Sequence, residues 1–298
     1  MIKYRSEYLY EYAKEHIPDR DVYPVFVPSY NRPNAKLLEK ALQDPSFPVI
    51  LCIREEQEEM YRQYKNHIHI MLLNGVSDIS ETREQIVQQA ALYYDNIFMM
   101  DDDITELDFL IPSQTKNGKD SMRSSRLCTG NSPRWTDILK MWMCLLKYDK
   151  NCDRIALSGV GYRPDSWVIT NAGKENQYNS AALIQCVHIN TKLIRENNIH
   201  YRPMREVGAE DYAFQFDVMS AGLLTTVYKD LLYNCPAINS HSGGCEGMLG
   251  LEAWERYRFC LEASKRFYEN HPGIKYTVTK RTGFETVKFN WDYWRKYV

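Results

Sequence analysis

Three consecutive carboxylates, Asp101, Asp102 and Asp103, directly follow a short apolar run at residues 97–100, IFMM. In an extended chain, side chains two residues apart share a face, so Asp101 and Asp103 are expected to point the same way. Carboxylates this close repel one another unless a positive charge lies between them. A hard divalent cation such as Mg²⁺ or Mn²⁺ meets that need, because it binds one or two carboxylates together with substrate phosphates. A solvated acidic turn is the alternative, but ligands of open α/β sheets bind beyond the carboxyl ends of strands, which favours a metal site.

A second pair of carboxylates, Glu210 and Asp211, begins the segment EDYAFQFDVMSAG. The apolar residues within this segment predict a helix over 211–221, with Gly222 as its C-terminal stop. The N-terminus of a helix stabilises negative charge, so capping by acidic residues is enough to explain the pair. The residues alone leave open whether these two carboxylates take part in chemistry.

A histidine in a glycine-rich stretch, His241 in NCPAINSHSGGCEGM, is a third candidate. Imidazole is a reasonable ligand for Mn²⁺, and the backbone N–H groups of the following Ser-Gly-Gly are suited to approach a diphosphate. A histidine in a surface turn is the plain alternative. A zinc site formed by Cys235, His241 and Cys245 is another, but this spacing is not that of a familiar structural zinc site.

The elements that must position these residues alternate along the first half of the chain. Apolar runs typical of buried strands cover residues 22–28, 48–53, 68–73 and 97–100. Polar, periodic segments typical of helices lie between them, at 35–43, 55–65 and 80–94. Strands and helices in this order predict βαβ units, and therefore a parallel sheet with helices on both faces and right-handed crossovers.

The second half of the chain is less regular. Residues 111–134 lack an apolar period and are rich in Ser, Asn, Gly and Pro, which predicts a long, basic loop. Further elements follow as a helix over 135–148, a strand and glycine-rich turn over 154–170, a strand over 181–189 and a helix over 250–269. Nothing resembles a linker that would divide the chain, so a single domain over 1–298 is expected.

Composition narrows the class of protein. Of the 298 residues, 44% are hydrophobic and 26% are charged, which excludes a disordered chain. The net charge of −2 means that any contact with nucleic acid must come from local basic patches. Neither a run of 18 apolar residues nor the apolar core of a signal peptide is visible, and the eight cysteines form no CxxC pair. We therefore expect reduced thiols and a cytoplasmic location, without membrane attachment.

The segments VFVPSYNRP and FMMDDDI resemble those of the GT-A nucleotide-sugar glycosyltransferases, in particular the family 2-like enzymes, over roughly residues 22–250. The resemblance implies an α/β fold of the GT-A type. Such a fold has a Rossmann-like, mostly parallel sheet with helices on both faces, here with an elaborated C-terminal half. It further implies a nucleotide-sugar-binding half over 22–110, an acceptor and catalytic half over 111–250, and a C-terminal helix and tail over 251–298.

The resemblance also assigns residues to the donor. In the family, the turn after the first strand contacts the nucleotide, and the DxD motif holds a metal ion on the nucleotide diphosphate. The residues implied to contact the donor are Pro28, Ser29, Tyr30, Asn31, Arg32, Arg83, Asp101, Asp102, Ser242 and Gly243. The implied ligands of the Mn²⁺ or Mg²⁺ ion are Asp101, Asp103 and His241. A UDP-sugar is the expected donor. The alternative for residues 28–32 is an ordinary Asn/Pro turn at a strand end, and the alternative for Arg83 is a charge on the surface of a helix.

The Glu-Asp pair of the family supplies the catalytic carboxylate. Asp211 is thus implied to accept the proton of the acceptor hydroxyl as a general base, with Glu210 orienting the acceptor. The cation would stabilise the leaving nucleoside diphosphate as a Lewis acid. The implied reaction is an inverting displacement without a covalent enzyme intermediate, and a retaining outcome stays open.

The acceptor region is expected between these two sites, in SGVGYRPDSW. Gly159 and Gly161 could admit a bulky group, and Tyr162 and Trp167 could stack on a ring. A glycine-rich hairpin with aromatic residues in the core is the alternative. The loop 111–134 and the tail 274–298 are both basic, and the tail interleaves its charges with aromatic residues. Such a pattern suits a nucleic-acid backbone and unstacked bases, although solvated charges around the core explain it equally well.

Among GT-A enzymes, the segments VPSYNRP, FMMDDDI, GAEDYAF and NSHSGG most resemble those of the bacteriophage TET-associated glycosyltransferases. These enzymes transfer sugars to hydroxymethylated bases in DNA, which implies a DNA acceptor such as hydroxymethylcytosine DNA, a flipped base, and a location in the host cytoplasm. A glycan or protein acceptor, a nucleotidyltransferase and a nucleotide-binding module without turnover are the alternatives. The oligomeric state stays open.

Overall fold

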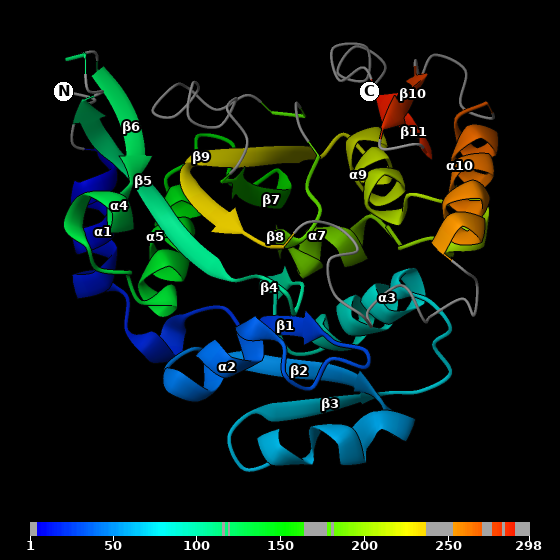
Figure 1. Ribbon diagram of the computed structural model, residues 1–298, viewed down its shortest axis with the longest axis horizontal. Coiled ribbons are helices and arrows are strands. Elements are labelled where there is room, and N and C mark those ends of the chain that lie inside the picture. The colour runs from blue at the N-terminus through cyan, green and yellow to red at the C-terminus, as the bar shows by residue number, and fades with distance from the viewer. Residues whose placement is uncertain are drawn as a thin grey trace.

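The computed structural model of the chain describes residues 5–114, 117–118, 120–163, 178–179, 182–236, 253–269, 276–281 and 284–289. Its centre is a nine-stranded mixed sheet with the strand order β3-β2-β1-β4-β8-β7-β9-β5-β6 (Figure 1). A separate two-stranded antiparallel hairpin joins β10 (Tyr276–Arg281) and β11 (Phe284–Phe289). The α/β class expected from the sequence is confirmed.

The four strands predicted in the first half of the chain form the parallel part of this sheet. They are β1 (Val25–Pro28), β2 (Val49–Arg54), β3 (His69–Leu73) and β4 (Ile97–Met100). Every residue of β1 and β4 is buried, because both faces of these strands are covered, and this explains their unbroken apolar runs. Three helices connect them, α2 (Lys36–Gln43), η3 (Glu55–Tyr64) and α3 (Ile79–Ala90). Of these, η3 is a 3₁₀ helix.

The other half of the sheet mixes directions. Its strands are β5 (Glu106–Gln114), β6 (Asp120–Ser124), β7 (Ile155–Tyr162), β8 (Cys186–Ile189) and β9 (Leu224–Asn234). Strand β8 is antiparallel to both β4 and β7, whereas β7 and β9 are parallel. The sheet therefore continues from the part expected to bind the donor into the part expected to bind the acceptor.

The expected loop over 111–134 is wrong. Residues 106–114 and 120–124 form the antiparallel pair β5–β6, and the short helix α4 (Ser125–Thr129) follows. An edge strand such as β6 needs apolar residues on one face only, so no apolar run marks it in the sequence. Met122 supplies that contact by packing against Leu110 and Leu232.

Helices cover both faces of the sheet. Besides those already given, they are α1 (Arg5–His16), η2 (Asp19–Asp21), α5 (Trp135–Lys147), α7 (Thr191–Glu196), α8 (Met204–Val207), α9 (Glu210–Ser220) and α10 (Ala253–Glu269). Successive residues of β1 serve opposite faces, as expected for a strand. Val25 and Val27 join a core with Trp142 of α5, and Phe26 joins a second core with Phe214 of α9.

Candidate active site

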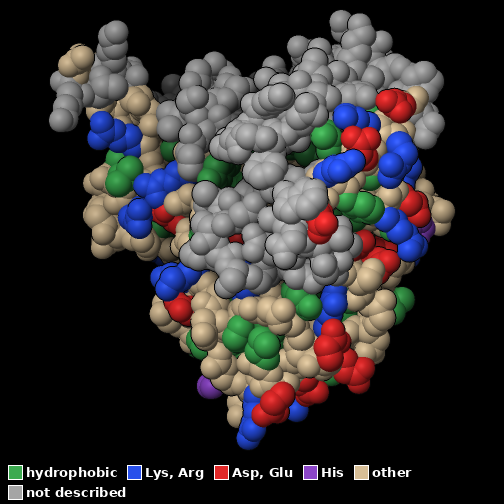
Figure 2. Space-filling view, turned by 45° about the vertical axis from the view of Figure 1, so that its right-hand side comes forward, with side chains coloured by type: hydrophobic (Ala, Val, Ile, Leu, Met, Phe, Trp, Pro, Cys, Tyr) green, Lys and Arg blue, Asp and Glu red, His purple; other side chains and the backbone are tan. Residues whose placement is uncertain are grey.

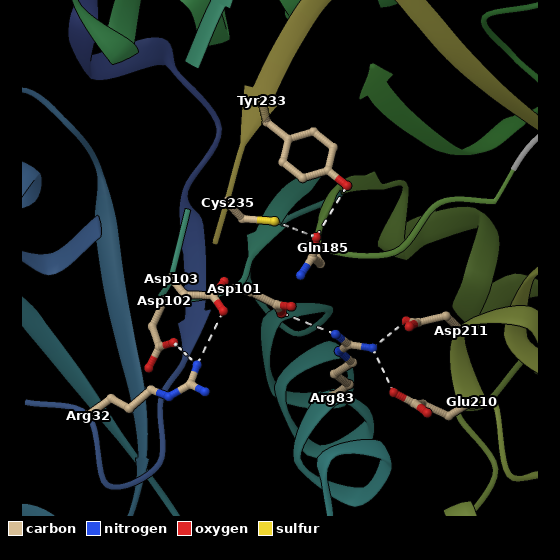
Figure 3. Close-up of polar contacts among 10 residues, drawn as sticks. All are labelled: Arg32, Arg83, Asp101, Asp102, Asp103, Gln185, Glu210, Asp211, Tyr233 and Cys235. Carbon is tan, nitrogen blue, oxygen red and sulfur yellow. Dashed lines mark hydrogen bonds and ion pairs between the residues drawn. The ribbon is translucent and has the colours of Figure 1, made fainter. Parts of the chain in front are cut away.

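The side chain of Arg83 lies among three carboxylates that come from two other parts of the chain (Figure 3). Its Nη2 donates to Oδ1 of Asp101 at 3.1 Å, and its Nη1 donates to Oε1 of Glu210 at 2.9 Å and to Oδ1 of Asp211. Only 4% of Arg83 is exposed. We call these four residues the Arg83 cluster. It brings together carboxylates that lie far apart in the sequence and were assigned to the donor and to the acceptor.

Each element that supplies the Arg83 cluster is fixed at its end. Helix α3 is capped by Asp78, whose Oδ1 accepts from the backbone N–H of Glu81 at 2.9 Å. The backbone N–H of Asp101 donates to the carbonyl of Gln185 at 2.9 Å, which fixes the chain where it leaves β4. Helix α8 ends at Val207, and the next residue, Gly208, has a φ of 72°, in the left-handed region that favours glycine; α9 begins two residues later.

Burial opposes ionisation in the Arg83 cluster. It raises the pKa of Asp101 to about 6, while the charge of Arg83 acts in the opposite direction. Burial also raises the pKa of Glu210, and it raises that of Asp211 well above its ordinary value, where the charge of Glu210 adds to the rise. Burial thus raises the proton affinity of Asp211, which is a property that a general base needs.

A second arginine binds the other two residues of the acidic triplet. Nη1 of Arg32 lies 3.2 Å from Oδ1 of Asp102 and 3.3 Å from Oδ2 of Asp103. The expectation that Asp101 and Asp103 share a face of an extended chain is wrong, because β4 ends at Met100 and residues 102–103 form a turn. The triplet is instead divided between two guanidinium groups, Asp101 on Arg83 and the other two on Arg32.

Two residues assigned to the donor turn out to hold the turn after β1. Ser29 is buried, and its Oγ donates to Oδ2 of Asp102 at 2.5 Å and lies 2.8 Å from the hydroxyl of Tyr61. Asp102 is buried as well, and burial raises its pKa to about 7. Both side chains therefore act on the neighbouring site by positioning the backbone around it. Pro28 is also buried, at the end of β1.

The structure gives a partial view of the predicted metal site. Oδ1 of Asp103 is buried and has no hydrogen-bond partner, and a quarter of the Asp101 side chain is exposed. Within the described ranges, no three His, Cys, Asp or Glu side chains come together in a way that could hold a metal ion. His241, Ser242 and Gly243 lie outside these ranges, as does Cys245 of the alternative zinc site. The two aspartates retain the oxygen ligands that Mg²⁺ or Mn²⁺ needs in addition to substrate phosphates.

The glycines expected to admit an acceptor are packed instead. A Cβ atom on Gly159 would lie 2.5 Å from Cδ2 of Leu183, so this glycine makes room for a core leucine and not for a ligand. Gly161 is buried in β7 opposite Leu232. Tyr162 is half-buried, with its ring 5.4 Å from that of Tyr233. Trp167 lies outside the described residues.

Sequence reasoning missed several residues that shape the site. Oε1 of Gln185 lies 3.0 Å from Sγ of Cys235 and 3.3 Å from the hydroxyl of Tyr233 (Figure 3), and no pattern in the sequence marks this glutamine. Tyr61, which holds the turn after β1, did leave a signal. It lies three residues before Tyr64 in an otherwise polar segment, a spacing that puts both rings on the buried face of a helix.

The fold and the site define an enzyme of the α/β class, with polar residues gathered beyond the carboxyl ends of adjacent strands. The sequence profile of the TET-associated glycosyltransferases matches residues 23–244, which is most of the chain. The chain therefore belongs to the TET-associated glycosyltransferase family, and its activity is glycosyl transfer.

Other comparisons add distant likenesses. A cytidylyltransferase from Leptospira borgpetersenii serovar Hardjo-bovis is 12% identical with a TM-score of 0.39, over 73% of this chain and 76% of that one. A structure of GalNAc-T7 with UDP, GalNAc and Mn²⁺ is 8% identical with a TM-score of 0.40, and the match covers 72% of this chain and 43% of the other. A search of curated proteins finds no match. No helix among the described residues has the length and apolar character needed to cross a membrane.

We predict that Arg83→Met lowers the free energy of unfolding by about 3–5 kcal/mol at pH 8, because three buried carboxylates lose their counter-charge. The loss should be smaller at pH 5. Without Arg83 the folded-state pKa values of these carboxylates rise further above the unfolded values, so their ionisation costs stability only as the pH rises. Urea unfolding at both pH values measures the difference. Arg62→Met, at an exposed ion pair with Glu59, is the control, and an equal loss at both pH values would contradict the prediction.

Proposed function

We propose that the protein transfers a sugar from a nucleoside diphosphate donor to a hydroxyl group, with Asp211 as the general base and Glu210 orienting the acceptor. The observation that carries this proposal is the Arg83 cluster, in which the two terminal nitrogens of one guanidinium hold Asp101 on one side and Asp211 on the other. A carboxylate suited to a cation and a carboxylate suited to proton transfer are thereby kept about one guanidinium width apart. This spacing suits a reaction between a bound diphosphate and a nearby hydroxyl.

The donor half of this proposal includes a Mn²⁺ or Mg²⁺ ion on Asp101 and Asp103, with His241 as a further ligand. Asp103 offers a buried oxygen without a hydrogen-bond partner, which supports this choice. When bound, such an ion stabilises the negative charge that develops on the leaving nucleoside diphosphate. Arg32 contacts Asp103 and lies in the turn after β1, so the turn and the metal ligand are held together. A UDP-sugar is the proposed donor.

The catalytic step follows from the environment of Asp211. The acceptor oxygen attacks the anomeric carbon while the bond from that carbon to the phosphate oxygen breaks, and the hydroxyl proton passes to the Asp211 carboxylate. The raised pKa of Asp211 increases its proton affinity, and Arg83 keeps its side chain oriented. A direct displacement of this kind inverts the configuration at the anomeric carbon.

The proposed acceptor is the hydroxymethyl group of a modified base in bacteriophage DNA. Family membership supports a DNA acceptor, and so does a charged group beside the active site. Glu106 is contacted by Arg163 and by Nε of Arg126 at 3.0 Å. Because two guanidinium groups share one carboxylate, the three side chains together carry a net positive charge. Several Lys and Arg side chains are also visible on the left of the face shown in Figure 2, among acidic and apolar side chains.

This charged group is connected to the Arg83 cluster through short contacts. Glu106 pairs with Asn234 across β5 and β9, and the backbone N–H of Arg163 donates to the carbonyl of Tyr233 at 2.9 Å. The Tyr233 hydroxyl contacts Gln185, whose carbonyl accepts from Asp101. In this proposal, Arg126 and Arg163 bind phosphates of the DNA strand, and a base flipped from the duplex reaches Asp211.

We predict that Asp211→Asn lowers the rate of sugar transfer by at least about 100-fold, because the amide cannot accept the acceptor proton. Donor affinity should stay within about threefold of wild type, since Asn keeps the shape of the side chain and an oxygen for Arg83. Transfer rates and calorimetric donor binding measure the two effects. Asp217→Asn changes the same residue type on α9 outside the site, and its rate should be that of wild type. Rapid turnover by Asp211→Asn would exclude Asp211 as the base.

We further predict that Asp103→Ala abolishes the part of nucleotide binding that depends on Mn²⁺, because a proposed metal ligand is lost. Calorimetry with UDP, with and without Mn²⁺, gives this difference. Asp95→Ala alters an exposed aspartate before the other end of β4 and should leave the Mn²⁺ effect intact. If the Asp103 variant keeps the full Mn²⁺ effect, the metal assignment is wrong.

For the acceptor, we predict that Arg126→Gln and Arg163→Gln each weaken binding to hydroxymethylcytosine DNA and reduce the slope of log K against log salt by about 1. Glu106→Gln should have the opposite effect, since it releases both guanidinium groups. Fluorescence anisotropy over a salt series measures the slopes, with Arg62→Gln as the control. Unchanged slopes would reject the proposed role of these two arginines in binding DNA, but not the DNA acceptor itself. If wild type modifies no DNA, as judged by mass spectrometry of nucleosides, the DNA acceptor is rejected.

A further inference from the structure

The side-chain amide of Gln185, the residue before β8, is held by two buried donors. Its Oε1 accepts from Sγ of Cys235 at 3.0 Å and from the hydroxyl of Tyr233 at 3.3 Å. Burial raises the pKa of the Cys235 thiol to about 11 and raises the pKa of Tyr233 as well, so both groups keep their protons at neutral pH. Only the oxygen of a carboxamide can accept these protons, because its nitrogen is a donor. The two neighbours therefore fix the orientation of the amide.

The nitrogen of the same amide faces the other way. Figure 3 shows Nε2 of Gln185 directed away from Tyr233 and Cys235 and toward the side of Asp101. Within the part of the chain that the structure describes, the hydrogen bonds of this side chain are the two on its oxygen. Gln185 is half-buried. Its amide thus presents two N–H donors, and no acceptor, to the site.

The segment that carries Gln185 is bound to both groups of catalytic carboxylates. The backbone carbonyl of Gln185 accepts from the N–H of Asp101 at 2.9 Å. Gln215 of α9 is buried, and its side chain accepts from the N–H of Leu183 at 3.1 Å and donates to the Leu183 carbonyl at 3.0 Å. The same amide donates to the carbonyl of Asp211 at 3.0 Å. Gln185 is thereby held in a fixed position relative to Asp101 and Asp211.

The residues assigned to the donor and Gln185 lie on opposite sides of Asp101. Strands β1 and β8 are the two neighbours of β4 in the sheet, so the turn after β1 and the residue before β8 flank the end of β4. The turn after β1 carries Tyr30 and Asn31, and the centre of the Tyr30 ring lies 4.4 Å from the guanidinium carbon of Arg54. Gln185 is therefore on the side away from this turn, in the half of the chain expected to bind the acceptor.

On this side, Gln185 is connected to one of the arginines proposed to bind DNA. The carbonyl of Tyr233, whose hydroxyl donates to Gln185, accepts from the backbone N–H of Arg163 at 2.9 Å. A flipped base whose hydroxymethyl group faces Asp211 would enter from the same side. The polar group that Gln185 presents there is suited to the hydrogen-bonding edge of that base.

Cytosine and uracil differ in what they offer to a pair of N–H donors. In both bases the hydroxymethyl group is attached to C5, and O2 lies opposite C5 across the ring with N3 beside it. Cytosine carries O2 and N3 as adjacent acceptors, whereas N3 of uracil carries a hydrogen. A base with its hydroxymethyl group at Asp211 directs this edge away from Asp211, so the edge can be contacted by a second polar group such as the Gln185 amide.

We propose that the side-chain amide of Gln185 recognises the flipped acceptor base and selects hydroxymethylcytosine over hydroxymethyluracil. This inference rests on the proposed DNA acceptor and adds the residue that distinguishes the two bases. The N–H groups of Gln185 donate to O2 and N3 of cytosine. With uracil, a donor of Gln185 faces the N3–H, and both donors are left unpaired. Cys235 and Tyr233 are positioning residues, because they prevent the amide from turning its oxygen toward the uracil N3–H.

The test is an internal competition between two duplexes that differ only in carrying hydroxymethylcytosine or hydroxymethyluracil at one position. Each modified base is placed opposite an abasic site, so that both cost the same to unpair. The full chain is mixed with both duplexes, Mn²⁺ and a mixture of UDP-glucose, UDP-galactose and UDP-N-acetylglucosamine, and mass spectrometry of nucleosides gives the ratio of products. This ratio equals the ratio of the two kcat/KM values and does not depend on the fraction of folded protein.

Wild type should favour hydroxymethylcytosine by at least about tenfold, because the mismatch with uracil leaves buried donors unpaired. Gln185→Leu should bring the ratio close to one by lowering the hydroxymethylcytosine value alone. Gln88→Leu replaces an exposed glutamine on α3, outside the site, and should keep the wild-type ratio.

Two further variants separate recognition from packing. Gln185→Glu replaces the donors by an acceptor and should invert the ratio, since a carboxylate accepts from the uracil N3–H and repels O2 and N3 of cytosine. The double variant Tyr233→Phe, Cys235→Ala keeps the amide but frees it to turn, and it should bring the ratio close to one. A role of these residues in packing alone predicts neither change. Thermal melting of each variant confirms that it is folded.

The outcomes distinguish this inference from the function on which it rests. A ratio that persists in Gln185→Leu, or a wild type that does not favour hydroxymethylcytosine, overturns the role of Gln185 and leaves the DNA acceptor standing. If Gln185→Leu instead slows transfer to both bases equally and weakens calorimetric UDP-sugar binding, Gln185 contacts the donor and the inference is also overturned. If wild type modifies neither duplex and binds neither more tightly than an unmodified one, the DNA acceptor itself is rejected, and the inference with it.

Discussion

The buried ion cluster around Arg83 is the interaction on which the rest of the site depends. A guanidinium from α3 is surrounded by Asp101 after β4 and by Glu210 and Asp211 at the start of α9. Because the planar guanidinium presents its donors in a fixed fork, it sets both the spacing and the relative orientation of these carboxylates. The parallel part of the sheet and the helical segment after β8 thus meet at one residue.

The charges of the Arg83 cluster do not balance. Three ionised carboxylates around one guanidinium leave an excess of negative charge in a place with little water. Burial raises the pKa values of all three carboxylates, and for Asp101 and Asp211 the negative charge of the neighbouring carboxylates adds to the rise. A cation bound at Asp101 would change the charge that Asp211 experiences through their shared arginine. Under the proposed mechanism, the affinity of Asp211 for a proton would therefore depend on whether a cation is bound at Asp101.

The sequence predicted the elements of the site better than the contacts between them. Unbroken apolar runs identified β1, β2, β3 and β4, because strands covered on both faces need apolar residues at every position. The acidic triplet was visible as unusual charge at the end of one of those runs, and the Glu-Asp pair was visible at the start of a predicted helix. Their distribution between Arg32 and Arg83 was not visible, since it depends on a turn at residues 102–103 and on how α9 approaches α3.

The failures have the same physical origin. Gly159 seemed to offer space for a ligand, but the space next to a glycine belongs to whichever side chain packs there, and here it is Leu183. The β5–β6 hairpin was taken for a loop because an edge strand can be largely polar. In both cases the outcome depends on which side chains or strands pack against the segment, and local composition does not show this.

The start of α3 explains why the site can keep its geometry while a substrate binds. Asp78 caps this helix, and its other carboxylate oxygen accepts from the backbone N–H of Met204 at 3.3 Å, next to α8. Ser80 donates to the carbonyl of Arg202 in the same segment. The turn of helix that precedes Arg83 is thus bound to the chain that leads into Glu210 and Asp211. Any movement of α3 would carry this chain with it, so the arginine and its carboxylates are expected to move as one body.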